Sequence, residues 1–344
     1  VHYERRTTAV RDTNDAEEHI HLAMIVTRKR NIIQFSTLMK NILYFQGRHN
    51  SKLPNCKLQW DTIHNDKCPS VSPPPYNPLE IHLVTDSEST DATSKFFQHL
   101  NLSGLIPHYY DIKQYEYLVD YERYLSRYPI IILLKTAWPQ ILPEKIEKVI
   151  CMDTDVLFNQ NVQNLWNLFN DFDDKQMIAG TFELTDNLRK YMATTEYPIL
   201  ETGVNSGLLL LHLKRMRKSN WDKVSAALTK QMIKNKKKLK FPDQLPCEWN
   251  LVISAAKQVR NCSVAWIISD IAKTDCITLP ASTALAGSLH FCAGNKPESK
   301  LQKTFRNPDP VKTVRNFSMK DLKNTFFEVY FVFRNLNVEC FQKN

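Results

Sequence analysis

The sequence is poor in glycine, and this scarcity excludes the common glycine-loop nucleotide sites. Only 7 of its 344 residues are glycine. Neither a GxGxxG nor a GxxxxGK run occurs, so the phosphate-binding loops of dinucleotide-binding proteins and of P-loop proteins are both absent. Any phosphate site in this chain must therefore be built differently.

The sequence also lacks a CxxC pair among its 8 cysteines, which argues against zinc ribbons and thioredoxin-type chemistry. An even number of cysteines fits an oxidising compartment. We expect a disulfide between Cys56 and Cys68, closing a proline-rich segment, and a free core thiol at Cys151. Three sequons would be glycosylation acceptors in a secretory lumen: Asn101, Asn261 and Asn316.

No apolar run approaches the roughly 18 residues of a membrane-spanning helix. The sequence begins at Val1 without a signal-peptide pattern or an initiator Met, so we expect residues upstream of it. The net charge is +9, with lysines concentrated at residues 234–240. This lysine run could attract anionic ligands or be a solvated helix end, but it lacks the interleaved aromatics of a nucleic-acid platform.

Short apolar segments alternate with amphipathic ones along most of the chain. This alternation predicts an α/β fold with one mixed, largely parallel sheet flanked by helices. We expect strands at 20–27, 79–85, 106–111, 147–152, 177–182 and 204–213. We expect helices at 31–46, 93–100, 123–138, 162–169 and 214–234.

Composition predicts four parts of the chain. Residues 1–18 are polar and resemble a stem or linker, and residues 19–300 form the main α/β domain. Residues 50–78 are rich in proline and form an irregular surface insert. Residues 301–344 form a C-terminal helical extension.

An Asp-x-Asp motif directly follows the apolar segment at 147–152, with Asp153 and Asp155 as its carboxylates. Side chains alternate along an extended chain, so both carboxylates are expected on one side, where they could hold one divalent cation against a diphosphate. The carboxyl ends of sheet strands are also where ligands bind in α/β proteins. Alternatively, the two aspartates cap a loop or the following helix.

Three segments together resemble glycosyltransferase family 8: residues 141–158, residues 162–166 and residues 202–211. The resemblance runs from about Ile20 to about Leu322, apart from the proline-rich insert, and is strongest to the glucoside xylosyltransferases. The dystroglycan-modifying bifunctional transferases come second. The resemblance implies that residues 19–300 are a catalytic domain with a GT-A (Rossmann-like) fold. Such a domain binds a UDP-sugar through Mn²⁺ and transfers the sugar with retention.

The same resemblance implies the ligands. Asp153, Asp155 and His290 would hold the metal, a sensible set for Mn²⁺, although a lone histidine after an apolar run could be structural. Gly294 and Lys296 resemble the family's diphosphate-binding turn. The remaining donor-binding residues that we expect are Val26, Thr27, Lys135, Asn205, Ser206 and Gly207.

Two of these expectations have alternatives in the residues themselves. Lys135 is a lone cation in a hydrophobic stretch and needs a partner, unless its side chain reaches solvent. Asn205 and Ser206 could hold sugar hydroxyls, with Gly207 permitting close approach, or could serve ordinary turn chemistry.

The sequence departs from the family at residues 243–250. The family carries Asp-Gln-Asp-x-x-Asn on a helix that contacts the sugar, whereas this chain has Asp243 and Gln244 followed by Leu245. In this register Asp243 and Gln244 are the catalytic candidates, supporting an oxocarbenium-like sugar. A rival register aligns residues 246–250 with a later Pro-Cys-x-Trp-Asn element and deletes the helix.

We expect a retaining transferase that moves a sugar, xylose first, from a UDP-sugar to a glycan on a secretory-pathway protein. The expected location is the Golgi or endoplasmic reticulum lumen, with a type II membrane anchor outside this chain. Retention could use front-face attack or a covalent carboxylate intermediate. The alternatives are an inactive relative that binds glycan or a partner protein and, third, a metal-dependent phosphohydrolase.

Overall fold

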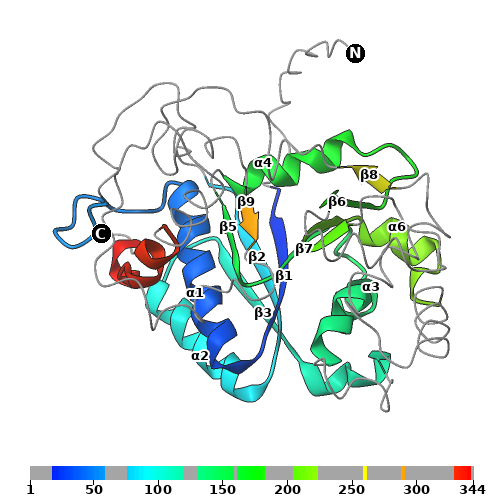
Figure 1. Cartoon of the computed structure of the whole chain (residues 1–344), viewed down its shortest axis with the longest axis horizontal. Coiled ribbons are helices and arrows are strands. Elements are labelled where there is room, and N and C mark those ends of the chain that lie inside the picture. Colours follow the sequence, from blue (N-terminus) through cyan, green and yellow to red (C-terminus); the bar gives the residue numbers. More distant parts are fainter. Residues whose placement is uncertain are drawn as a thin grey trace, which may run out of the picture.

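A seven-stranded sheet forms the centre of the molecule (Figure 1). The computed structural model describes residues 18–58, 76–119, 130–158, 161–182, 204–223, 259–261, 288–290 and 329–341. The strand order is β3-β2-β1-β4-β7-β6-β8. These strands are β1 (Ile20–Val26), β2 (Leu79–Thr85), β3 (Leu105–Asp111), β4 (Val149–Met152), β6 (Ile178–Phe182), β7 (Val204–Leu211) and β8 (Val259–Asn261).

The sheet is mixed and largely parallel, as the alternation of elements predicts. Strands β3, β2, β1 and β4 run parallel to one another, β7 is antiparallel to β4 and β6, and β8 is parallel to β6. A second, two-stranded antiparallel sheet joins β5 (Val156–Phe158) to β9 (Ser288–His290). The expectation of a single sheet missed this pair, because both strands are only three residues long.

Helices cover both faces of the central sheet, so its strands are apolar on both sides. One face packs against α1 (Arg28–Phe45) and α2 (Ser87–Leu100), together with α4 (Val162–Trp166), η5 (Asn167–Asp171) and η8 (Val338–Phe341). The other face packs against η4 (Ile130–Ala137), α3 (Trp138–Ile141) and α6 (Leu213–Lys218), with η2 (Ile112–Gln114) and η3 (Glu116–Val119). Figure 1 shows α1 and α2 on one side of the sheet and α3 and α6 on the other.

Alternating residues of β1 show how this layering arises. Leu22 and Met24 are fully buried in the cluster under α1 and α2, while Ala23 and Ile25 belong to the cluster under η4 and α3. A strand whose two faces are both covered is apolar at nearly every position. The first strand was predictable for that reason.

Three helix predictions differ from the structure. Helix α2 begins at Ser87 instead of residue 93. Residues 123–129 of the helix predicted at 123–138 lie outside the described part of the chain, and the rest is the 3₁₀ helix η4 followed by the start of α3. The predicted helix at 214–234 ends at Lys218, because Asn220 takes a left-handed backbone conformation with φ of 54°, which terminates helices. Residues 221–223 are helical again, and residues 224–234 lie outside the described part of the chain.

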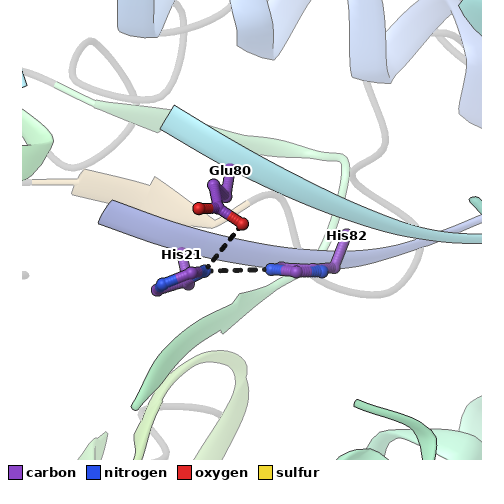
Figure 2. A group of neighbouring side chains, drawn as sticks. All are labelled: His21, Glu80 and His82. Carbon is purple, nitrogen blue, oxygen red and sulfur yellow. Dashed lines mark hydrogen bonds and ion pairs between the residues drawn. The ribbon is translucent and has the colours of Figure 1, made fainter. Parts of the chain in front are cut away.

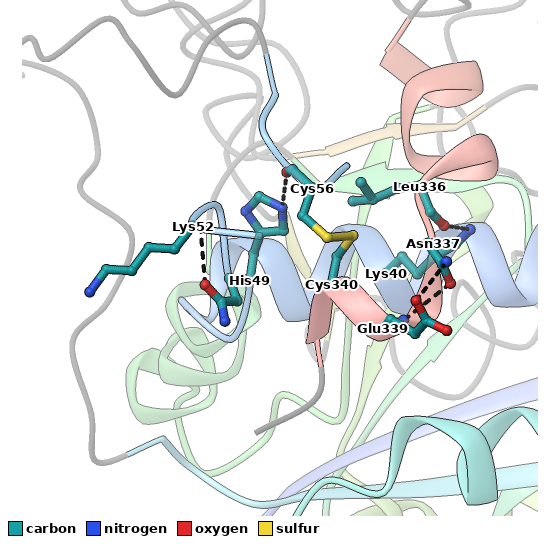
Figure 3. Close-up of a disulfide and its surroundings, with 9 residues drawn as sticks. Lys40, His49, Lys52, Cys56, Leu336, Asn337, Glu339 and Cys340 are labelled. Carbon is teal, nitrogen blue, oxygen red and sulfur yellow. Dashed lines mark hydrogen bonds between the residues drawn. A yellow bond between two sulfur atoms is a disulfide. The ribbon is translucent and has the colours of Figure 1, made fainter. Parts of the chain in front are cut away.

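The disulfide prediction was wrong: Cys56 is bonded to Cys340, across 284 residues (Figure 3). The expected pairing with Cys68 relied on proximity in sequence, whereas the fold docks the chain's C-terminal segment against α1. The amine of Lys40 donates to the carbonyls of Arg334 and Leu336 at 2.7 and 2.8 Å, and the Asn50 amide donates to the Cys340 carbonyl. Cys151 is free and buried, as predicted.

The described helices include none that combines the length and the apolar character needed to cross a membrane. The longest is α1, which carries charged residues in its first turn and buried polar residues further along.

Candidate active site

The carboxyl ends of the central parallel strands form the edge at which most predicted site residues lie. Val26 ends β1 and Thr27 follows it, and both are almost completely buried. Asp153 follows directly after β4, the neighbour of β1. Ligands of open α/β sheets bind at this edge.

The Asp-x-Asp motif forms the connection between the two sheets. The Asp153 amide donates to the carbonyl of Gly207 at 2.9 Å, which extends the β4–β7 ladder by one bond. Residues 154–155 then form a turn, so the strict side-to-side alternation that we expected through the motif does not continue past Asp153. Asp155 is only 2% exposed.

Helix α1 holds this turn through two buried amides that the sequence reasoning missed. The Thr154 hydroxyl donates to Gln34 Oε1 at 3.2 Å. The Asn41 side chain donates to the Phe158 carbonyl at 3.0 Å and accepts from the Phe158 amide at 2.6 Å, which fixes β5. Gln34 and Asn41 lie seven residues apart, two helical turns, and this polar pair on an apolar face is the signal that could have found them.

Lys135, the lysine in the hydrophobic stretch, has a charged partner, as one of the two expectations predicted. Lys135 Nζ lies 2.6 Å from Asp153 Oδ1, with the two side chains 12% and 25% exposed. Trp221 supports η4 from the other side by donating to the Thr136 carbonyl at 3.0 Å. The structure therefore favours the ion pair over a side chain that extends into solvent.

A distant histidine reaches the acidic turn through the second sheet. In the β5–β9 pair, His290 is the register partner of Val156, the residue after Asp155. Opposed residues of an antiparallel pair have Cα atoms about 4.5–5.5 Å apart. The register thus brings the backbone of His290 beside the motif, across more than 130 residues of sequence.

The β7 residues named as sugar contacts lie where the sheet is irregular. The β6–β7 register jumps from Gly180↔Leu209 to Thr181↔Asn205, so Ser206 and Gly207 stand opposite the irregularity. Such irregularities occur often beside active sites. Ser206 is 6% exposed, and Gly207 accepts the bond from Asp153.

Four predicted site residues lie outside the described part of the chain: Asp243, Gln244, Gly294 and Lys296. The lysine run at 234–240 does too. The two registers considered for residues 243–250 therefore both stay predictions.

One strained residue at the carboxyl edge had no signal in the sequence. Arg28, the first residue of α1, has a φ of 74°, a conformation that non-glycine residues rarely adopt. Strained backbone of this kind costs about 1–3 kcal/mol and concentrates at functional sites. Arg28 is therefore a further candidate at this edge.

The donor groups of this site suit a divalent cation. Two carboxylates, with an imidazole on the adjoining strand, match the oxygen and nitrogen ligands that Mn²⁺ accepts. Gln34 Nε2 is buried beside the turn with no hydrogen-bond partner among the described residues, so this region also offers an N–H donor to a ligand oxygen. The arrangement can hold a cation and an anionic ligand together.

Comparison with known proteins assigns the chain to a family. The model of glycosyl transferase family 8 matches residues 57–297. The chain belongs to glycosyl transferase family 8. This confirms the resemblance found in the sequence motifs.

Mouse xylosyl- and glucuronyltransferase LARGE2 is one of the curated relatives. It is 28% identical to this chain over 209 residues, which cover 54% of this chain and 30% of the relative. The rat LARGE2 enzyme is 25% identical over 268 residues, covering 71% of this chain and 34% of the relative. Human LARGE1 is 28% identical over 206 residues, covering 54% and 27%. The chain spans about a third of the length of the curated relatives it matches, or less.

Solved structures show that the fold is that of GT-A glycosyltransferases. Mouse xyloside xylosyltransferase 1 in its apo form matches with a TM-score of 0.51 at 19% identity, covering 73% of this chain and 87% of that one. The WbbM bifunctional glycosyltransferase matches with a TM-score of 0.56 at 11% identity, covering 95% and 51%. The predicted GT-A architecture is therefore confirmed.

Proposed function

We propose that this chain is the catalytic unit of a retaining, Mn²⁺-dependent glycosyltransferase. It moves a sugar, with xylose as the first candidate, from a UDP-sugar to a glycan acceptor on a secretory-pathway protein. The observation that carries the proposal is the β5–β9 register, which sets His290 opposite the residue after Asp155. A histidine from far downstream beside a buried acidic turn is the arrangement that a shared cation requires.

Asp153, Asp155 and His290 would hold the Mn²⁺ ion. When bound, the ion supplies positive charge that stabilises the diphosphate leaving group. Asp153 is partly exposed, whereas Asp155 is buried. Asp153 is therefore the carboxylate more accessible to an incoming ligand.

Lys135 would supply a second positive charge to the leaving group. Its amine lies 2.6 Å from Asp153, so a diphosphate held near that carboxylate by the cation would fall within its reach. Gly294 and Lys296 complete the diphosphate contacts in this proposal, and Val26 and Thr27 contact the uridine. A lysine ammonium acts there as a point charge.

The sugar would lie against β7 and residues 243–244. Asn205 and Ser206 hold sugar hydroxyls, Gly207 permits close approach, and Asp243 or Gln244 supports the positive charge that develops on the sugar. In front-face attack the departing phosphate oxygen takes the acceptor's proton. The other route to retention is a covalent intermediate on a carboxylate.

The choice of xylose rests on relatives. LARGE2 is named a xylosyl- and glucuronyltransferase, and the mouse structural neighbour is a xyloside xylosyltransferase. UDP-xylose and UDP-glucuronic acid are therefore the first two donors to test. The changed stretch at 243–250 keeps one other candidate open, an inactive relative that binds glycan or a partner protein.

We place the protein in the lumen of the Golgi or endoplasmic reticulum. The Cys56–Cys340 disulfide requires an oxidising compartment. Asn101 of the first sequon is exposed at the end of α2, where a glycan could be attached. Both observations support the lumenal location.

A donor screen tests the proposal. UDP release is measured across UDP-sugars with Mn²⁺ and with EDTA, for the wild type, Asp155→Asn and the matched control Asp91→Asn, whose carboxylate is exposed on α2. Metal stabilisation of a leaving group is worth several kcal/mol, so Asp155→Asn is expected to slow UDP release at least about 100-fold. Asp91→Asn should match the wild type.

Two results would count against this assignment. Full UDP release by Asp155→Asn would refute the metal site. Binding of UDP and Mn²⁺ by calorimetry, with no turnover of any donor, would instead support the inactive relative.

A further inference from the structure

A cluster of histidines lies on the central sheet, between the amino ends and the middle of its strands, away from the candidate active site. His21 comes from β1, and Glu80 and His82 come from β2. The parallel register pairs His21 with Glu80, and His82 lies two residues further along. All three side chains therefore project from one face of the sheet.

The ligand atoms of this histidine–glutamate cluster already converge (Figure 2). His21 Nδ1 lies 3.1 Å from His82 Nε2 and 3.7 Å from Glu80 Oε2. One ligand atom from each residue lies within 4.8 Å of the other two. Donor atoms around a tetrahedral zinc ion with bonds of about 2.0–2.1 Å are separated by about 3.3 Å, close to these spacings.

The protonation states suit a cation. Burial lowers the pKa of His82 to about 3, helped by the nearby His21 and His108, so its imidazole is neutral. Burial alone would raise the pKa of Glu80, but the hydrogen bond from His19 and the charges of His21 and His108 bring it below its usual value. A neutral imidazole and an ionised carboxylate are the forms that bind metals.

Tyr110 on β3 supplies the outer contact that metal-binding histidines usually have. Its hydroxyl lies 3.0 Å from His82 Nδ1. Burial raises the pKa of Tyr110 to about 12, so the hydroxyl stays neutral. A bond from Nδ1–H of His82 to this oxygen would leave the lone pair of Nε2 facing His21.

Two more histidines stand at the rim. His19 Nδ1 lies 2.7 Å from Glu80 Oε1, and His108 Nε2 lies 3.0 Å from Glu80 Oε2. Both rim side chains are 37% exposed, whereas Glu80 is 16% exposed. These two exposed histidines give a cation a route from solvent, and either could supply its fourth ligand.

We propose that His21, Glu80 and His82 form a binding site for a zinc-class divalent cation that links β1 to β2. This site is separate from the proposed Mn²⁺ site. His21 and Val26 are five positions apart on β1, which corresponds to about 16 Å at 3.3 Å per residue. One ion cannot serve both ends of the strand, so the second site does not depend on the proposed transfer reaction.

The test is a Co²⁺ titration, followed by Zn²⁺ competition, of tag-free protein stripped with EDTA. The visible absorption of Co²⁺ reports the coordination number. The Asp155→Asn background removes a carboxylate of the other proposed site and should still bind one equivalent. In that background we expect His21→Gln to weaken binding about 100-fold or more and Tyr110→Phe about tenfold, since outer contacts are worth 10–100-fold.

His99→Gln, an exposed histidine on α2, is the matched control and should bind as the background does. Circular dichroism shows whether each variant is folded, and Zn²⁺ should raise the melting temperature of the wild type but not of His21→Gln. The proposal is overturned if folded His21→Gln and Glu80→Gln keep the affinity. It is also overturned if the wild type binds no Co²⁺ or Zn²⁺ in the micromolar range, which would leave a hydrogen-bonded histidine chain.

Discussion

At the scale of single residues, the pairing of Lys135 with Asp153 decides which substitutions give interpretable results. Removing one partner of a largely buried ion pair leaves an uncompensated charge and can cost about 3–5 kcal/mol. Asp153→Ala would therefore mix loss of a metal ligand with loss of stability. Asp155→Asn keeps the Lys135 pair and is the cleaner test of the metal site.

Because the pKa of the buried Lys40 is lowered, we expect the protein to become more stable as the pH rises. Burial, with a smaller contribution from Arg334, lowers the pKa of Lys40 from 10.5 to about 8. The folded state binds this proton more weakly than the unfolded state does. The protonated Lys40 therefore lowers the free energy of unfolding, and this effect is largest below pH 8. It is relieved between about pH 8 and 10.5.

The free energy of unfolding in urea measures this effect. Between pH 7 and 9.5 the wild type should gain about 2 kcal/mol relative to Lys40→Met, and the exposed Lys29→Met should track the wild type. A difference between wild type and Lys40→Met that stays constant with pH would contradict the prediction.

The residue scale also shows what sequence could not supply. Lys135 and the two aspartates stood out because a charge in an apolar stretch is conspicuous. Gln34 and Asn41 did not stand out. Their structural role is to form hydrogen bonds with Thr154 and Phe158, which lie more than 110 residues away in the sequence. Local patterns carry no information about such partners.

At the scale of helices and strands, short strands position residues of the candidate active site. Strand β9 has three residues, yet its register with β5 decides which residue stands beside the acidic turn. A shift of one residue would turn each side chain of β9 to the other side of that sheet. The register is therefore more informative about the site than the strand's length suggests.

The start of helix α2 gives a test at this scale. The Asp86 side chain accepts from the Ser89 amide at 2.8 Å and caps the helix. Asp86→Ala is expected to lower the free energy of unfolding by about 1 kcal/mol, because a helix-end N–H loses its acceptor. Urea denaturation measures the loss.

Asp91→Ala is the control, since Asp91 is exposed within the same helix. Its effect should stay within about 0.5 kcal/mol. Equal losses in the two variants would show that the cap contributes nothing beyond an ordinary surface aspartate.

Helices and strands were predictable where a buried segment is apolar along its whole length. Strand β2 has the predicted bounds and β1 ends one residue early, because both of their faces are covered. The start of α2 was missed because its first turn is polar, so its signal is the cap and not an apolar period. The end of α6 depends on one left-handed asparagine.

At the scale of the whole molecule, the C-terminal segment is part of the main core. Tyr330, Phe333 and Phe341 are each about 1% exposed in the same cluster as α1. The disulfide ties this segment to the region after α1 (Figure 3). The last described residues therefore stabilise the layer that carries Gln34 and Asn41.

Breaking this disulfide should destabilise the protein by about 2–5 kcal/mol, because it closes a loop that spans most of the chain. Urea denaturation of Cys340→Ser against the wild type measures the loss. Peptide mapping without reductant should recover one linked pair containing Cys56 and Cys340. Recovery of a Cys56–Cys68 pair would contradict the structure.

The fold class was predictable from the alternation of strands and helices, and the family from the order of its motifs. The docking of the C-terminal segment was not, since eight cysteines allow many pairings and nothing local distinguishes them. Four predicted site residues lie outside the described part of the chain, so they stay predictions.

Anomalous diffraction at the manganese edge, from crystals grown with Mn²⁺ and UDP, tests the central claim most directly. The account predicts a manganese peak within about 2.0–2.3 Å of oxygens of Asp153 and Asp155 and of a ring nitrogen of His290, with UDP phosphate beside it. A manganese peak away from Asp155 and His290, with UDP bound elsewhere, would contradict it.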